Sequence, residues 1–354
     1  MEYKLGELVE QVTETNTELN FGLNDIVGVT IDKKIIPTIA NLKETDLKKF
    51  VIVSPNDFIY NPRTHGKKIG LGYNNADRKY IATWNNNTFR IKAEKRNTIL
   101  SDYLYLYFNR EIWDKEACFN SWGSSTVVFS WDSFCDMKIN LPDIEEQKKI
   151  VKEYQVILNN KNIIEKENKV LESLAHTIYK ETIDNCEEWT EINLGNSAKI
   201  SAGGDNPSDT VLEKTDKCQV PVYSNGVTDD GLFGYTSKAK INEESITISA
   251  RGTIGFTALR MHPYTPIVRL ISIIPNDNNM IEFLYMYFKY LKYDDDGSVQ
   301  QQATKPYFEA MNINIPKNIV EFKNKIRPIL NLIENNKQKC KLLEKILFLR
   351  LSSI

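Results

Sequence analysis

The sequence has few of the residues that metal centres and disulfide frameworks need. Its cysteines are scattered and form no CxxC pair: Cys118, Cys135, Cys186, Cys218 and Cys340. An odd number of dispersed cysteines argues against a disulfide framework and against a structural zinc site. The three histidines lie far apart, so a metal centre would find few nitrogen ligands. We therefore expect reduced thiols and no bound metal.

Long hydrophobic runs are also missing. No apolar stretch approaches the roughly 20 residues that span a bilayer, and residues 1–4 open into polar sequence without a signal-peptide pattern. The chain has 354 residues, 41% of them hydrophobic and 26% charged. This balance is typical of a globular protein of two or three domains. We expect a cytoplasmic protein.

Each segment that resembles a catalytic or nucleotide-binding motif lacks part of that motif. Gly70-Leu71-Gly72 lacks the third glycine of a dinucleotide-binding loop, and no GxxxxGK loop exists. Asn61-Pro62-Arg63 has arginine where adenine methyltransferases have a second proline. No nucleophile, general base and orienting group can be assembled from the spacing. We predict a chain without catalytic residues.

The chain does contain a long internal repeat. Phe134 and Ile139-Asn140-Leu141-Pro142 recur 174 positions later as Phe308 and Ile313-Asn314-Ile315-Pro316. Gly123-Ser124 recurs in the same way, and Leu5-Gly6 has a weaker match in Leu194-Gly195. A repeat of this length indicates a duplicated domain. It predicts four segments: a unit at 1–142, a long helix at 143–184, a second unit at 185–316 and a second long helix at 317–354.

Each unit is predicted to be a mixed α/β globule. Short β-rich runs alternate with turns, among them Phe50–Val53, Phe58–Tyr60, Ser245–Ile248 and Ile267–Ile271. Residues 102–110 and 280–291 place aromatic side chains on a helical period, which favours core helices. The expected fold is α/β (mixed α+β), with two similar globules and two long helices.

The two long helices show heptad spacing. Asp143 is the expected N-cap, with Glu146 as its capping-box partner. The predicted seam consists of Ile150, Tyr154, Ile157, Ile164, Leu171, Ile178, Phe322, Ile326, Ile329, Ile333, Leu343 and Leu347. Such spacing predicts an antiparallel coiled coil, and polar residues at Lys161 and Asn336 would select one alignment. The alternative is two amphipathic helices that each pack on their own globule.

Charge is unevenly distributed although the net charge is only −2. Nine Lys and Arg between Asn61 and Leu100 face only Asp77 and Glu94. A basic excess of this size suits a phosphate backbone. The matching stretch of the second half, residues 238–269, has five basic residues against Glu243 and Glu244. A solvated charged face is the alternative for both stretches.

Several residues in these stretches are candidates for DNA contact. In the first half, Arg, Lys and His side chains could contact phosphate or guanine, and an asparagine triplet could offer the bidentate amide that reads adenine. These candidates are Arg63, His65, Lys67, Lys68, Arg78, Lys79, Asn85, Asn86 and Asn87. The triplet could equally be a turn. The second half offers Arg251, Thr253, Gln300, Gln301 and Lys305.

Two variable units, each closed by an Ile-x-Ile/Leu-Pro strand and followed by a heptad helix, resemble the specificity subunit of type I restriction-modification enzymes. The Pro142–Gln147 opening of the first helix and the Arg251–Gly255 turn also match that family, whereas residues 60–66 depart from the turn. The resemblance implies two target-recognition domains that the antiparallel helices hold apart as a ruler. It implies no catalysis by this chain.

The resemblance also implies a target and partners. The target is double-stranded DNA with an asymmetric, bipartite site, because the two units differ in sequence. The partners are two methyltransferase subunits and a translocating restriction subunit. S-adenosylmethionine, ATP and Mg²⁺ belong to those partners, and this chain binds no cofactor. The alternatives are a DNA-binding adaptor outside restriction, and a coiled-coil scaffold with two protein- or glycan-binding globules.

Overall fold

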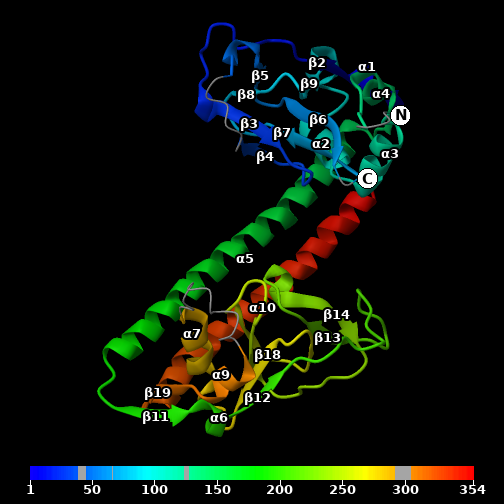
Figure 1. The fold of residues 1–354 in the computed structure, drawn as a ribbon. Helices are drawn as coiled ribbons and strands as arrows, with labels where there is room; N and C mark the ends of the chain where they lie inside the picture. Colours follow the sequence, from blue (N-terminus) through cyan, green and yellow to red (C-terminus); the bar gives the residue numbers. More distant parts are fainter. Residues whose placement is uncertain (39–44, 66, 123–126, 292–303) are drawn as a thin grey trace. The chain divides into compact units, whose positions relative to one another are not determined.

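The computed structural model describes residues 1–38, 45–65, 67–122, 127–291 and 304–354. The chain divides into two compact units: unit 1 holds residues 1–164 and 339–354, and unit 2 holds residues 165–338. The long helices α5 (Ile144–Asp184) and α10 (Ile319–Ser352) each give one part to unit 1 and the other to unit 2. Figure 1 shows the mixed α/β architecture, which confirms the predicted fold class.

Unit 1 contains two four-stranded sheets and a two-stranded sheet. The first sheet has the antiparallel order β2 (Val9–Gln11), β9 (Asn87–Ile91), β6 (Phe58–His65), β7 (Lys68–Tyr73). The second has the order β4 (Ile35–Pro37), β3 (Ile26–Val29), β8 (Tyr80–Ala82), β5 (Val51–Val53), with β3 and β8 parallel. Strand β1 (Glu2–Lys4) pairs with β10 (Lys138–Asn140). The helices are α1 (Leu5–Leu8), α2 (Ser101–Phe108), α3 (Glu111–Phe119) and α4 (Trp131–Asp136).

Unit 2 repeats this arrangement. Its antiparallel sheet has the order β12 (Ala198–Ala202), β18 (Ile271–Pro275), β15 (Ser245–Ile248), β16 (Thr257–Arg260). A three-stranded sheet has the order β14 (Leu232–Thr236), β13 (Val220–Tyr223), β17 (Thr265–Pro266), with β13 and β17 parallel. Strand β11 (Trp189–Asn193) pairs with β19 (Asn312–Pro316). The helices are α6 (Leu194–Ser197), α7 (Ile281–Tyr290) and α9 (Lys305–Glu309).

The two strand orders correspond element by element. Strands β2, β9, β6 and β7 occupy the places of β12, β18, β15 and β16, and the parallel pair β3–β8 occupies the place of β13–β17. Among the described residues, β5 has no counterpart in unit 2. The duplication seen in the sequence is therefore a duplication of topology, and connections between equivalent strands can be compared directly.

The weak Leu-Gly match between the openings of the units has a structural cause. Leu5 and Leu194 are fully buried, and each donates its backbone N–H over 2.8 Å, to the carbonyls of Met137 and Met311. A Cβ on Gly6 would lie 2.8 Å from the Cβ of Cys135, and one on Gly195 would lie 2.6 Å from a carbonyl of α9. Both positions need glycine because a short helix passes too close for any side chain.

The aromatic stripes predicted for the core are indeed buried. In α2, Tyr103, Leu104, Tyr107 and Phe108 are at most 5% exposed, and they recur on one helical face. In α7, Phe283, Leu284, Met286 and Phe288 are at most 1% exposed. Phe134 and Phe308, the repeated phenylalanines, are fully buried at equivalent places. These residues stabilise each unit and are not available for stacking on bases.

The long helices pair antiparallel within each unit. In unit 1, Lys161 lies 3.1 Å from Glu344 and Glu153 lies 2.7 Å from Arg350, so α10 runs backward along α5. In unit 2, Asn336 donates to the Asn168 side chain over 3.0 Å, and the Tyr179 and Phe322 rings lie 6.3 Å apart. Every predicted seam residue is buried or half-buried. Coiled-coil geometry along the whole seam remains an inference from the heptads.

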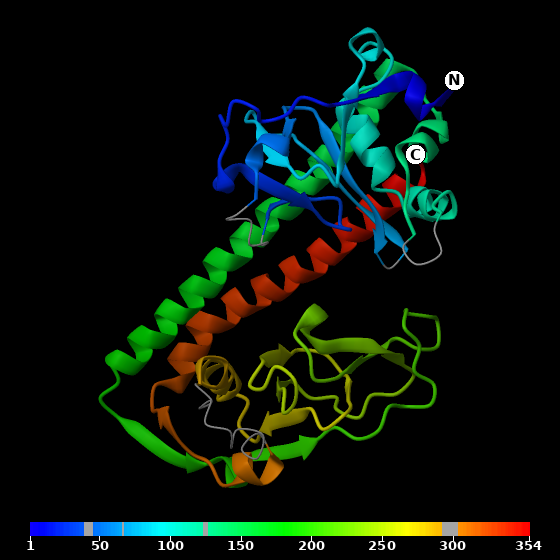
Figure 2. The same ribbon diagram turned by 45° about the horizontal axis from the view of Figure 1, so that its top comes forward.

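Parts of both helices also pack on the core of the unit to which they belong, as the alternative interpretation of the heptads proposed. Ile150 and Tyr154 of α5, and Leu351 and Ile354 at the end of the chain, all pack against the unit 1 core. Figure 2 shows the last turns of α10 beside the short helices of unit 1. The fully buried Gln147 accepts a hydrogen bond from the Leu100 N–H over 3.0 Å and donates to the Thr98 carbonyl over 2.9 Å. The Asp143 side chain accepts from the Glu146 N–H over 2.9 Å, which confirms the N-cap.

In unit 2, an arginine fastens α10 to the globule. Arg327 lies 2.6 Å from Glu282 of α7 and 2.6 Å from Glu244. Glu282 is fully buried, and burial raises the pKa of its carboxyl despite the nearby guanidinium. Helix α10 continues through Pro328, which removes one backbone donor from the helix.

One strand prediction is wrong, and some of the predicted residues lie outside the described part of the chain. Residues 267–271 were predicted to form one strand, but only Ile271 belongs to a strand, because Val268 and Arg269 have positive φ angles of 52° and 62°. Gln300, Gln301 and the repeated Gly123-Ser124 and Gly297-Ser298 lie outside the described residues. In the part of the chain that the structure covers, no helix combines the length and apolar character of a membrane span.

Candidate nucleic-acid interface

A cavity of about 250 Å³ in unit 1 gathers several candidate residues. Its lining comes from the end of β3, from β6 and from the β8–β9 connection: Gly28, Val29, Asn61, Arg63, Thr83, Asn85 and Asn86. Strands β3 and β8 are parallel, so their carboxyl ends meet at one edge of the sheet. The cavity therefore joins a cation and several amides that are far apart in sequence.

The β6–β7 hairpin adds further positive charge beside this cavity. Arg63, Lys67 and Lys68 are exposed, and none of the three makes an ion pair with a described carboxylate. Lys67 adopts a positive φ of 66° at the hairpin turn. The backbone of His65 belongs to β6 and pairs with the backbone of Lys68 in β7. Exposed cations without acidic partners are suited to phosphate contacts.

Arg78 and Lys79 lie at the other end of the parallel pair. They precede β8, and Arg78 lies 2.9 Å from Asp25, which precedes β3. The Arg78 guanidinium also lies 4.7 Å from the centre of the Tyr80 ring. These contacts reduce the freedom of Arg78, and the structure does not bring it together with Arg63 and Asn85.

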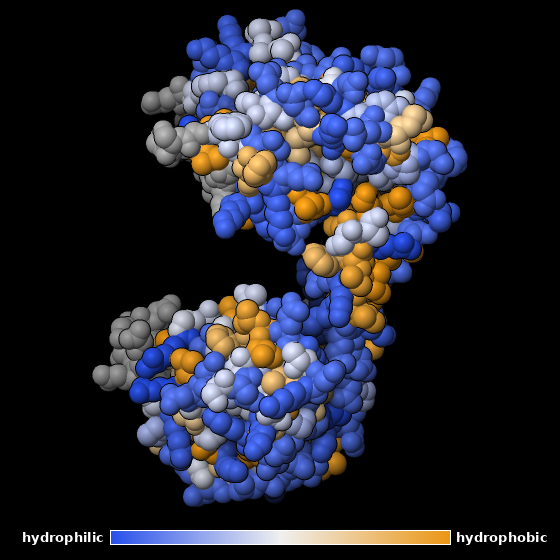
Figure 3. All heavy atoms as spheres, turned by 90° about the vertical axis from the view of Figure 1, so that its right-hand side faces the viewer, coloured by the Kyte–Doolittle hydropathy of each residue, from blue (hydrophilic) through white to orange (hydrophobic). Residues whose placement is uncertain are grey.

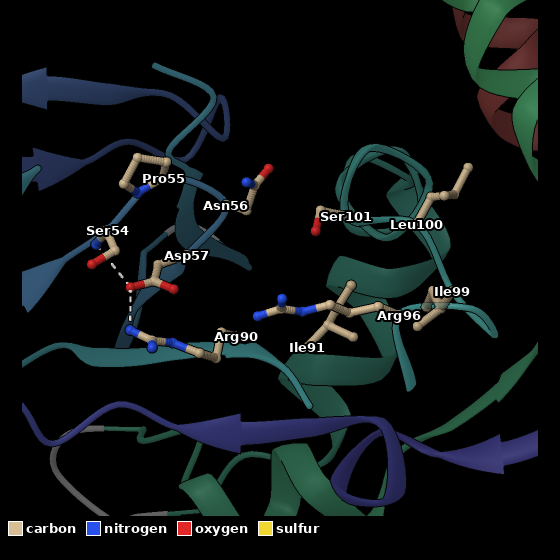
Figure 4. A pocket seen from close by; sticks show the side chains of 10 residues that line it. All are labelled: Ser54, Pro55, Asn56, Asp57, Arg90, Ile91, Arg96, Ile99, Leu100 and Ser101. Atoms are coloured by element: carbon tan, nitrogen blue, oxygen red, sulfur yellow. Dashed lines mark hydrogen bonds and ion pairs between the residues drawn. The ribbon is translucent and has the colours of Figure 1, made fainter. Parts of the chain in front are cut away.

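Other cations of the basic stretch have structural contacts. Arg90 lies 2.9 Å from the buried carboxylate of Asp57, at a cavity of about 340 Å³ that Figure 4 shows beside the start of α2. Burial raises the pKa of the Asp57 carboxyl, although the Ser54 N–H and Arg90 oppose this shift. Lys92 donates to the Gly6 carbonyl over 2.8 Å. Part of the local basic excess therefore holds unit 1 together.

The asparagine triplet combines a turn with an exposed amide. Asn86 donates from its backbone and from its side chain to Thr83, both over 3.0 Å, as the turn alternative predicted. Asn87 begins β9, and its side chain accepts from Gln11 over 3.0 Å. Asn85 is exposed and lines the cavity. Of the three, Asn85 is best placed to contact a base.

Unit 2 has a cavity of about 470 Å³ beside β17–β18, the connection that corresponds to β8–β9. It is lined by the ends of β12 and β18, by the β15–β16 and β17–β18 connections and by the start of α9: Ala202, Ala250, Arg251, Gly252, Arg269, Ile271, Thr304 and Lys305. The structure thus brings together Arg251 and Lys305, which sequence reasoning named. Lys305 also lies 3.3 Å from Glu309, and Thr253 is exposed in the same turn as Arg251.

Arg269 is the residue that sequence reasoning missed at this cavity. It was placed inside a predicted strand, where its side chain would alternate with buried neighbours. A turn beginning at Ile267 exposes it instead. The sequence signal was weak, because Val268 and Arg269 are not residues that usually adopt positive φ.

The two cavities correspond in part in the duplicated topology, although β3 adds a wall in unit 1 and β12 and α9 add walls in unit 2. Arg63 lies near the end of β6, before the β6–β7 connection, and this connection corresponds to the β15–β16 connection with Arg251. The β8–β9 connection with Asn85 corresponds to the β17–β18 connection with Arg269. Among the residues that the structure describes, no carboxylate lines either cavity. Each unit thus presents cations beside the same pair of connections, and unit 1 adds amides.

A family model described as the type I restriction modification DNA specificity domain matches residues 1–173 and again residues 186–346. The chain belongs to this family. The two matches cover both halves of the duplication, so each unit is one specificity domain with its share of the helices. Within the described residues, no three His, Cys, Asp or Glu side chains gather in a way that could hold a metal ion.

Relatives and solved structures agree with the family. Two curated Mycoplasma pneumoniae proteins named as type I specificity subunits are 33% identical over 146 residues and 39% identical over 131 residues. The alignments cover 40% and 37% of this chain, and 44% and 36% of those proteins, so the chain matches less than half of each relative's length. The crystal structure of a type I S subunit from M. genitalium shares the fold, with a TM-score of 0.65 at 16% identity, covering 99% of this chain and 94% of that one.

Proposed function

We propose that this chain is the DNA sequence-recognition subunit of a type I restriction-modification complex. Each unit reads one half of an asymmetric, bipartite duplex target, and the chain itself carries out no catalysis. The observation that carries the proposal is that each of two units of the specificity-domain family has a cation-lined cavity beside an equivalent connection, with no described carboxylate in its lining. Since Asn85 and Arg269 occupy corresponding connections, the two half-sites should differ in sequence.

The partners that we propose are two methyltransferase subunits and a restriction subunit that translocates DNA. S-adenosylmethionine, ATP and Mg²⁺ would bind to those subunits. Cytoplasmic location also stays a prediction, and it follows from a chromosomal DNA target. One copy of the chain with two similar units suits two copies of the methyltransferase, because each unit can offer an equivalent surface.

Exposed apolar side chains on the long helices support this assembly. Within unit 1, Val156 and Ile163 of α5 and Leu342, Phe348 and Leu349 of α10 are each at least 52% exposed. Within unit 2, Val170 and Leu174 of α5 are at least 46% exposed. Figure 3 shows apolar surface gathered along the helices. Large apolar side chains in groups on an otherwise charged helix favour contact with another protein.

The proposal is tested with the complex of this chain and the methyltransferase encoded with it. Selection from a library of randomised duplexes should enrich one motif with two unlike half-sites and an unread spacer. Replacement of residues 1–142 by the first unit of a relative should change one half-site only. A change in both half-sites would refute the modular function. Absence of salt-dependent DNA binding would favour the scaffold alternative.

A further inference from the structure

The β17–β18 connection of unit 2 has an unusual backbone. Val268 and Arg269, which are consecutive and not glycine, have φ angles of 52° and 62°. A positive φ is a true outlier for a β-branched residue such as valine. Strained conformations of this kind persist only where the surrounding contacts impose them, and they gather at functional sites.

The contacts that impose this conformation come from the end of β12. Val268 donates its N–H to the Gly204 carbonyl, and Arg269 donates its N–H to the Gly203 carbonyl, both over 2.8 Å. A Cβ at Gly203 would lie 2.7 Å from the backbone nitrogen of Ile267. The sequence Gly203-Gly204 therefore allows a close approach that fixes the turn.

Asn225 connects this turn to the other arginine-bearing turn of the cavity. Its amide nitrogen donates to the Val268 carbonyl over 2.6 Å, and its amide oxygen accepts from the Ala250 N–H over 2.8 Å. Ala250 immediately precedes Arg251. One side chain thus sets the position of the Arg269 turn relative to the Arg251 turn.

The result is a fixed backbone at Arg269, next to small and apolar residues of the cavity lining. Arg269 lines the cavity beside Ala202, Ala250, Gly252 and Ile271. Within the part of the chain that the structure describes, neither the Arg269 nor the Arg251 guanidinium has an ion pair. Small side chains leave room for a flat group to approach the Arg269 fork.

We propose that Arg269 is the guanine-reading residue of unit 2 and that Asn225 is its positioning residue. This inference rests on the proposed function. Phosphate contacts tolerate a flexible cation, whereas recognition of guanine N7 and O6 needs a guanidinium fork of fixed orientation. A turn that is locked on both sides fixes the backbone from which the Arg269 side chain starts, and so limits the orientations that its guanidinium can take. Arg251 and Lys305, on either side of the cavity, contact the flanking phosphates.

The corresponding connection of unit 1 supports the assignment. Asn85 stands there, on the β8–β9 connection, and lines the unit 1 cavity. An amide pairs with adenine as a guanidinium pairs with guanine. The same loop would then set base identity in both units.

The test compares base preferences of the methyltransferase complex, with the wild-type chain or a variant, on a randomised duplex library. Arg269→Ala should lower the preference for guanine at one position of one half-site by about 5- to 150-fold, and leave the other half-site unchanged. Lys217→Ala, which removes an exposed cation of unit 2 outside the cavity, is the matched control and should change no preference.

A second variant distinguishes a loss of guanine recognition from a loss of stability. Arg269→Gly should not lower the unfolding temperature, since glycine tolerates positive φ, yet it should lose the same guanine preference. Asn225→Ala should weaken that preference too, and should add little when Arg269 is already alanine, because both act on one contact.

Three results would overturn the inference. Arg269→Ala and Arg269→Gly could weaken binding equally for all sequences and reduce the salt slope by about 1, which would make Arg269 a phosphate contact. They could leave base preferences unaltered. The base preference could also survive in Arg269→Gly. If the wild-type complex enriches no motif at all, the proposed function fails first, which is a distinct outcome.

Discussion

The side chains around the two cavities limit what they can bind. Cations line both cavities, amides line the cavity of unit 1, and no carboxylate among the described residues lines either one. This composition favours a polyanion with hydrogen-bonding edges over a cation or an apolar ligand. Arg63 and Arg78 come from one basic stretch but differ in their surroundings, so they offer a direct comparison.

We expect Arg63→Ala to weaken binding of the complex to its target by about 1–3 kcal/mol, and to relax at most one position of the half-site read by unit 1. Arg78→Ala should have a smaller effect, because Arg78 is paired with Asp25 at the other end of β8. Fluorescence anisotropy on matched and mismatched duplexes measures both. A larger effect for Arg78 than for Arg63 would contradict DNA binding at the unit 1 cavity, because Arg78 lies at the other end of the β3–β8 pair.

A second residue gives a pH-dependent prediction. The hydroxyls of Ser237 and Thr236 and the Ser237 N–H lower the pKa of the Asp209 carboxyl to about 2. Because the folded pKa lies below the unfolded value, Asp209 stabilises unit 2 above about pH 4, and this contribution disappears as the pH falls toward 2. The difference in unfolding temperature between wild type and Asp209→Asn should therefore shrink between about pH 5 and pH 2. A constant difference over this range would contradict the assignment.

The sequence was informative about residues where local chemistry decides the structure. Asp143 caps α5 as its type and position predicted. The sequence showed the basic excess but not which of its cations have structural contacts. Arg90 and Lys92 hold unit 1 together through Asp57 and Gly6. Such partners lie far away in sequence, so only the fold could reveal which cations remain available.

At the scale of elements, the polar positions in the helix seam determine alignment. Asn336 is 2% exposed and donates to Asn168 over 3.0 Å within unit 2. A buried polar pair in an apolar seam favours one register over its neighbours, at a cost in stability. The heptads of the sequence predicted Asn336 as a polar seam position.

Asn336→Leu alone should destabilise unit 2 by about 1–3 kcal/mol, since the Asn168 side-chain oxygen loses its hydrogen bond from Asn336, whereas the double variant Asn168→Leu and Asn336→Leu should be close to neutral. Urea unfolding of the four proteins of this cycle measures the coupling. Simple additivity of the two single effects would show that the pair does not act as a unit.

A further element-scale prediction concerns the length of the helices. One heptad inserted after Leu158 in α5, with one after Ile346 in α10, keeps the antiparallel partners of unit 1 opposite each other. It lengthens the pair by about 10 Å, or about three base pairs of duplex. We expect the spacer in the selected motif to grow by about three base pairs, with both half-sites unchanged. An unchanged spacer would refute the ruler that the family resemblance implies.

Helices and core strands could be predicted because periodicity alone defines them. The β17–β18 connection could not, because its strain is imposed by Gly203 and Asn225 from other parts of unit 2. Residues 267–271 read as a strand in isolation. Sites whose geometry depends on distant contacts are the ones that sequence patterns miss.

At the scale of the whole molecule, duplication explains both the fold and the proposed function. The equivalent strand orders place unlike side chains, Asn85 and Arg269, at the same place in two similar frames. A duplicated reader with diverged contact residues predicts a target of two unlike halves, and the family match covers both copies.

The most direct test of this central claim is to express the chain with its methyltransferase in a host without DNA methylation and to sequence modified bases on single molecules. We predict methylation at one bipartite, asymmetric motif that disappears when this chain is omitted. Methylation at a continuous or palindromic motif, or the same methylation without the chain, would contradict two units that each read one half-site.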